Sequence, residues 1–190
     1  MKKAAGYFFL IILPLTVSVS FNTNDDENPS GDKIDFFVPE KTDKLLFYLQ
    51  RRINANTVVY ELNRNANGDI DIAEPVKISW IKNAKDTARE PLNYIQRTFA
   101  YGLEIKLIDA GKKSFSVEFV SYRKKQLFLL KSAFDNKYHI YAYINNKLSV
   151  LEKVFVQIEG GTFWFPNIKY VELKGNIPYA SEEVVERIKP

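Results

Sequence analysis

From residue 44 onward, short stretches of apolar residues are separated by turn residues. In residues 114–119, Phe115, Val117 and Phe119 alternate with serine and glutamate, which is the two-residue period of a strand with one buried face. Such stretches recur about every 8 to 14 residues, as is typical of an all-β sandwich or barrel. They predict strands over residues 45–52, 57–62, 76–81, 103–108, 114–122, 126–131, 138–144, 148–158 and 162–173.

The links between these predicted strands are short and rich in turn residues. Examples are residues 110–113, residues 145–147 and the pair Gly160-Gly161. Short hairpin links favour antiparallel pairing between strands that follow one another in the chain. We therefore expect a mainly β fold, an antiparallel meander that forms an up-and-down barrel or a sandwich.

The period of the pattern becomes helical between the third and fourth predicted strands. Apolar residues recur there at helical spacing: Leu92, Ile95 and Phe99. Thr87 and Glu90 have the spacing of a capping box, and Gly102 is placed to end a helix in a left-handed conformation. One inserted helix is predicted over about residues 91–101.

The ends of the chain differ in composition from its centre. Lys2 and Lys3 precede an apolar run of 16 residues, Ala4 to Val19, which is the order of a secretory signal peptide over residues 1–20. A membrane span needs roughly 20 apolar residues, so we expect cleavage and export rather than retention as an anchor. Residues 21–43 are polar and predict a disordered tether. Residues 44–190 are then expected to form a single domain that ends in a short helix, over residues 181–188.

The composition argues against several kinds of chemistry. The chain has no cysteine and one histidine, His139, so we expect no disulfide, no cysteine nucleophile and no zinc site built from several histidines. His139 lies in a β-patterned run and is expected to be a strand residue rather than a general base. No catalytic residue is predicted. Without Lys2 and Lys3, 25 basic and 23 acidic residues leave a charge of +2, which gives no reason to expect nucleic acid as a partner.

Residues 63–74 resemble the twelve-residue calcium loop of the EF-hand, with glycine at its sixth position and glutamate at its twelfth. The candidate ligands all carry oxygen atoms: Asn63, Asn65, Asn67, Asp69, Asp71 and Glu74. A β-patterned run precedes the loop, however, and Pro75 follows it, where that family has helices. We favour a hairpin loop with Asn67-Gly68 at its turn, and keep weakly bound calcium as the alternative. No other cofactor is expected.

Two further groups of residues could contact a ligand if the fold brings them together. The first group carries guanidinium, amide and phenol side chains, which could bind a carboxylate, a sulfate or sugar hydroxyls. Its members are Arg51, Asn54, Gln96, Arg97 and Tyr101. Trp80 and Trp164 could line an apolar or carbohydrate-stacking pocket. The alternatives are arginines on the surface beside a helix and aromatic side chains packed in the core.

Several segments resemble a family of exported bacterial proteins catalogued only as a domain of unknown function. These segments are residues 47–51, 56–60, 75–80 and 92–97, followed by Ala100-Tyr101-Gly102. The resemblance covers about residues 44 to 175. It implies a single exported domain and brings no activity, ligand or catalytic residue.

Together, these patterns favour a non-enzymatic binding or envelope-associated protein, periplasmic or secreted, that meets the membrane only during export. The expected partner is an envelope component or a ligand, either a small apolar or amphipathic molecule or a glycan, held in the mouth or interior of the sheet. One alternative is an enzyme that cleaves envelope polymers with two carboxylates, for which Glu118, Glu152 and Glu159 are candidates. A second alternative is a calcium-stabilised interaction module.

Overall fold

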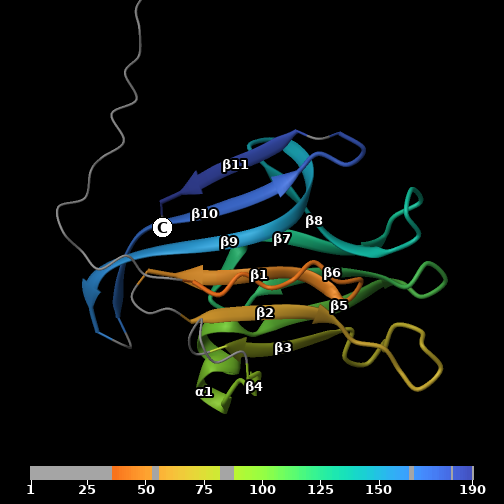
Figure 1. Cartoon of the computed structure of the whole chain (residues 1–190), viewed down its shortest axis with the longest axis horizontal. Helices are drawn as coiled ribbons and strands as arrows, with labels where there is room; N and C mark the ends of the chain where they lie inside the picture. Colours follow the sequence, from red (N-terminus) through yellow and green to blue (C-terminus); the bar gives the residue numbers. More distant parts are fainter. Residues whose placement is uncertain (1–35, 53–55, 82–87, 163–164, 181, 190) are drawn as a thin grey trace, which may run out of the picture. The chain divides into compact units, whose positions relative to one another are not determined.

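The computed structural model describes residues 36–52, 56–81, 88–162, 165–180 and 182–189 (Figure 1). Asn54, Trp164, the predicted signal peptide and most of the predicted tether lie outside these residues. Residues 34–190 group into one compact unit. None of the helices in the described part of the chain is long and apolar enough to span a membrane.

The fold is mainly β, as predicted, with one short helical segment. The strands are β1 (Leu45–Arg51), β2 (Thr57–Leu62), β3 (Val76–Ile81), β4 (Glu90–Pro91), β5 (Leu103–Asp109), β6 (Ser114–Phe119), β7 (Tyr122–Lys131), β8 (Tyr138–Ile144), β9 (Lys147–Gly161), β10 (Pro166–Asn176) and β11 (Glu183–Ile188). The helical segment is α1 (Tyr94–Gln96), which continues as the π-helix η1 (Arg97–Tyr101).

A single curled sheet contains these strands in the order β4-β3-β2-β1-β9-β8-β7-β6-β5, with β10 and β11 branching from β9. The prediction that neighbours in sequence pair in antiparallel fashion is correct for most pairs, including β1 with β2. An exception to the all-antiparallel meander is the second pairing of β1, which is parallel and joins it to β9 (Tyr48 opposite Lys153). The length of β9 explains this exception. Its start pairs with β8, its middle pairs with β1, and its other edge pairs with β10 (Figure 1).

Alternation along the strands sends apolar side chains into one core inside the curl. Phe115, Val117 and Phe119 of β6 are all buried, as their spacing predicted. Phe47 of β1 stacks on Tyr60 of β2 with ring centroids 4.1 Å apart, and Phe119 meets both rings edge-on. Aromatic pairs of this kind add about 0.5–1.5 kcal/mol beyond the burial of their area. These contacts join the two halves of the sheet, because β1 and β6 are far apart in the strand order.

The helical segment differs from its prediction at both ends. It begins at a capping box formed by Asn93 and Gln96, whose side chains each accept a hydrogen bond from the other residue's backbone amide. It ends at Gly102 in an extended conformation (φ −64°, ψ 162°), so the predicted left-handed ending is wrong. Glycine is needed there for space, since a Cβ atom would lie 1.9 Å from the carbonyl oxygen of Arg97.

Two predictions about the ends of the domain are also wrong. Residues 183–188 form β11 rather than a helix, because Val184 and Ile188 alternate into the core while β11 pairs with β10. Residues 36–43 lie against the sheet rather than in a free tether. Phe36 packs edge-on against Phe155, and the Phe37 carbonyl accepts hydrogen bonds from Gln50 and Thr57.

Candidate functional site

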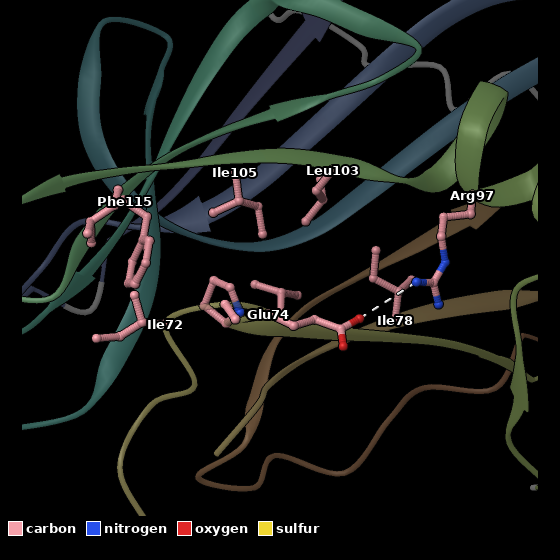
Figure 2. A pocket seen from close by; sticks show the side chains of 11 residues that line it. Ile72, Glu74, Ile78, Arg97, Leu103, Ile105 and Phe115 are labelled. Carbon is pink, nitrogen blue, oxygen red and sulfur yellow. Dashed lines mark ion pairs between the residues drawn. The ribbon is translucent and has the colours of Figure 1, made fainter. Parts of the chain in front are cut away.

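A slot lies between β3 and β5, which face each other near the two ends of the curled sheet (Figure 2). No pairing joins these two strands in the described part of the chain. The slot encloses a volume of about 240 Å³. Its lining residues are Ile72, Ala73, Glu74, Pro75, Val76, Ile78, Arg97, Leu103, Ile105, Leu107 and Phe115.

The walls of the slot are apolar because strand alternation places every second side chain on the same face. Leu103 and Ile105 of β5 lie on one side of the slot and Ile78 of β3 on the other (Figure 2). Leu107 of β5 and Val76 of β3 also line it, two residues along from Ile105 and Ile78 on the same strands. Leu107 is 45% exposed, so the β5 side opens to solvent at its far end. The slot therefore combines apolar side chains from two strands with the polar groups of Glu74, Arg97 and the loop backbone, and it is accessible from outside.

The end of the β2–β3 loop closes one side of the slot and is held by hydrogen bonds. The Asp71 carboxylate accepts from the backbone amides of Ala73 and Glu74. The Asn63 side chain donates to the carbonyl oxygen of Glu74 at 2.9 Å. These bonds fix the backbone that presents Ile72 and Glu74 to the slot. Asp71 and Asn63 therefore position the wall without lining it.

Two ion pairs join this loop to η1 and to the β5–β6 turn, and the pair with η1 lies at the slot. Arg97 Nη1 lies 3.6 Å from Glu74 Oε1, and both side chains are more than half exposed (Figure 2). Lys113 Nζ, in the β5–β6 turn, lies 3.5 Å from Asp69 Oδ2. Exposed pairs of this length contribute at most about 1 kcal/mol each. They can therefore open at little cost when a ligand enters.

The candidate calcium ligands all lie in the described part of the chain, and side-chain oxygen atoms of Asn65 and Asp71 bind the backbone of the loop itself. Asn65 Oδ1 accepts from the amides of Asn67 and Asp69, while the Asp69 and Glu74 carboxylates pair with Lys113 and Arg97. Gly68 has φ +81°, the left-handed geometry expected of a hairpin turn. No three carboxylate, histidine or cysteine side chains gather as a metal site anywhere in the described residues. Calcium binding stays a prediction for experiment.

The predicted polar group is divided between three places. The Arg51 guanidinium lies over the Tyr101 ring, 5.4 Å from its centroid. Gln96 is buried in the capping box, and Arg97 alone of this group lines the slot. Trp80 packs against the core from β3 and does not line the slot. Phe165, the residue after Trp164 in the sequence, is 82% exposed.

The carboxylates proposed for an enzyme do not meet in the slot. Glu152 pairs with Lys41 and Glu159 with Lys169, both on the surface. Glu118 lies opposite Glu104 across β5 and β6, outside the slot lining. Glu74 is the one carboxylate among the lining residues. The slot therefore lacks the acidic pair that hydrolysis of a glycosidic bond requires.

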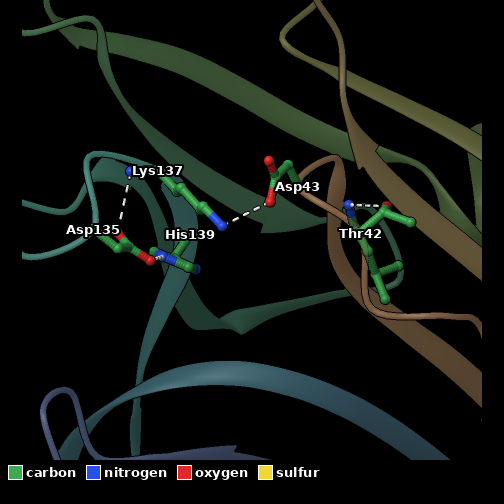
Figure 3. Close-up of polar contacts among 6 residues, drawn as sticks. Thr42, Asp43, Asp135, Lys137 and His139 are labelled. Carbon is green, nitrogen blue, oxygen red and sulfur yellow. Dashed lines mark hydrogen bonds and ion pairs between the residues drawn. The ribbon is translucent and has the colours of Figure 1, made fainter.

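His139 takes part in a surface network at the β7–β8 turn (Figure 3). Its Nε2 lies 2.8 Å from Asp135 Oδ2. Slight burial opposes ionisation of Asp135, but hydrogen bonds from the Lys137 amide and from His139 hold the pKa of Asp135 below its usual value. Lys137 Nζ also binds Asp43 at 2.7 Å, and this contact lowers the pKa of Asp43. The network ties residue 43 to the turn, and it places His139 outside the slot.

Sequence reasoning missed most of the residues that line the slot. The sequence pattern predicts one face of a strand that carries Leu103, Ile105 and Leu107. It does not indicate that this face borders an open slot rather than a filled core. Glu74 and Arg97 were each named for another role, as a calcium ligand and as part of an arginine cluster. They meet because the β2–β3 loop folds back toward η1.

Comparison with known proteins adds the family but no function. A family model for a domain of unknown function, DUF4833, matches residues 47–187. No curated protein matches the chain. No solved structure matches it either. Because the match covers most of the chain, including every residue that lines the slot, the protein belongs to the DUF4833 family of domains of unknown function.

Proposed function

We propose that this protein is a binding domain that holds a small amphipathic molecule in the slot between β3 and β5. The observation that carries the proposal is the combination of apolar walls with a charged rim: the walls suit an apolar body, and Glu74 with Arg97 suits a polar head. The predicted signal peptide suggests that it does so outside the cytoplasm, in the periplasm or after secretion.

The size of the slot supports a small ligand. A volume of about 240 Å³ equals roughly eight water-sized groups, below the range of about 300–1,000 Å³ that is usual for drug-sized ligands. Phe115, only 1% exposed, forms part of the lining near the core. A long acyl chain or an oligosaccharide would therefore project from the slot rather than fill it.

The proposal is tested by calorimetric titration with isohexanol, a branched alcohol with an apolar body and a polar head. The test variant is Leu107→Trp, which fills the slot from β5. The matched control is Ile108→Trp, because Ile108 is the next residue along β5, is 56% exposed and is not part of the slot lining. Binding that Leu107→Trp weakens at least tenfold and Ile108→Trp leaves unchanged would support the proposal. Equal effects of the two variants, or no binding by the parent protein, would refute it.

A further inference from the structure

The rim of the slot carries one positive and one negative group that face each other at short distance. Arg97 Nη1 and Glu74 Oε1 are 3.6 Å apart, on opposite sides of the slot (Figure 2). Resting on the proposed function, we infer that the ligand is a zwitterion, an apolar α-amino acid. Its carboxylate would face Arg97, its ammonium would face Glu74, and its side chain would enter the slot.

The spacing of charges matches this class of ligand. In an α-amino acid, standard bond lengths place the nitrogen and the carboxyl carbon about 2.5 Å apart, on a single tetrahedral carbon. The rim offers the opposite charges at a similarly short separation. The ligand dipole can therefore lie antiparallel to the rim dipole, with each of its charges next to an opposite charge.

The backbones that carry the two rim groups are both fixed. The Glu74 carbonyl accepts from Asn63, and its amide donates to Asp71. The Arg97 amide donates to the Asn93 carbonyl at the start of the helical segment. The two side chains are exposed and can rotate. The backbone at each rim residue is therefore fixed, while the charged end of each side chain can adjust to a small polar head group.

A ligand with a single charge fits less well. An anion that approaches Arg97 also approaches the Glu74 carboxylate, which repels it, and a cation at Glu74 meets Arg97 in the same way. A zwitterion satisfies both rim groups and leaves neither unpaired. The electrostatics of the rim therefore select for a head group with both charges.

The slot also selects for the side chain. Branched aliphatic residues and Phe115 make up most of its lining, and its volume corresponds to roughly eight water-sized groups. Leucine and amino acids of similar size match this space, whereas glycine leaves the apolar walls exposed. We expect leucine to bind and glycine to bind at least tenfold more weakly.

The test compares leucine with two analogues that each lack one charge: isocaproate, without the ammonium group, and isoamylamine, without the carboxylate. Affinities are measured by calorimetry on the purified protein, with isohexanol as the neutral reference. Leucine should bind about tenfold more tightly than either analogue, since each lost charge removes one charge-assisted contact. Glu74→Gln removes the partner of the ammonium group, so in this variant leucine should bind no more tightly than isocaproate. Arg97→Gln removes the partner of the carboxylate, so there leucine should bind no more tightly than isoamylamine. Lys113→Gln, at the other ion pair, should change neither ratio.

The outcomes separate this inference from the proposed function. If isohexanol binds in the slot and leucine binds no better than the singly charged analogues, the zwitterion inference is wrong while the binding function stands. If neither isohexanol nor leucine binds, both are wrong. The two rim substitutions lie on exposed side chains, so the variants should fold, and circular dichroism checks this before titration.

Discussion

The hydroxyl group of Tyr60 donates a hydrogen bond to the backbone carbonyl of Tyr101, with 2.9 Å between the oxygen atoms. Tyr60 lies on β2 and is fully buried, and Tyr101 is the last residue of η1. The bond therefore ties the helical segment to the core of the sheet. Because η1 also carries Arg97, this buried contact supports the rim of the slot from behind.

Replacing Tyr60 with phenylalanine should destabilise the protein by about 1–2 kcal/mol, because the Tyr101 carbonyl then loses its buried donor. Urea unfolding measures the change. Tyr143→Phe is the control, since Tyr143 is 56% exposed. Equal stability of Tyr60→Phe and the parent protein would show that this bond does not hold η1 in place.

Stability should also fall at alkaline pH. Burial first, and then the neighbouring Tyr101, raises the pKa of Tyr60 well above its ordinary value of 10.0. Above about pH 10 the unfolded chain loses this proton while the folded chain keeps it, so the free energy of unfolding decreases as pH rises; below about pH 10 both states keep the proton and the stability is intact. The urea midpoint should drop as the pH rises from about 10 to about 11, and less so in Tyr60→Phe. An identical drop in both proteins would contradict this assignment.

Gly102→Ala should be strongly destabilising, by about 2–4 kcal/mol, because the added methyl group would lie 1.9 Å from the Arg97 carbonyl oxygen and η1 would have to move. Gly111→Ala provides a matched control. Its nearest neighbour, Asp109 Oδ1, is 3.4 Å away, so the change should stay within about 0.5 kcal/mol. Thermal unfolding of the two variants distinguishes a steric requirement at Gly102 from a general loss of glycine flexibility.

Calcium should leave the stability unchanged. The oxygen atoms of Asn65 and Asp71 accept backbone hydrogen bonds, and the Asp69 and Glu74 carboxylates face Lys113 and Arg97. We expect the same melting temperature in millimolar calcium and in chelator. A clear rise in calcium that Glu74→Gln abolishes would instead favour the calcium-stabilised module.

Features that depend on neighbours in sequence were predictable, and features that depend on distant segments were not. The two-residue period of Phe115, Val117 and Phe119 reports directly on a buried face, and the structure confirms it. The parallel pairing of β1 with β9 joins segments about 100 residues apart, and nothing in either segment marks the other as its partner. At the C-terminus, Ser181 predicted a helix cap, but Val184 and Val185 favour a strand, and the pairing of residues 183–188 with β10 forms one.

The candidate site shows the same division. The sequence predicted Glu74 as a calcium ligand and Arg97 as a ligand-binding residue, because patterns of charged and oxygen-bearing side chains can be recognised from the sequence alone. It could not show that they face each other across an apolar slot, since this depends on how far the sheet curls. The two halves of the sheet are joined by β9, which pairs with three strands, β8, β1 and β10.

The most direct test of the binding proposal is an NMR titration of methyl-labelled protein with isohexanol. We expect concentration-dependent shifts of the methyl groups that line the slot, those of Ile72, Ile78, Leu103, Ile105 and Leu107, while core methyl groups remote from the slot, such as those of Leu127 and Ile140, stay unchanged. Shifts confined to another part of the surface, or no saturable shifts at all, would contradict the assignment of the slot as the binding site.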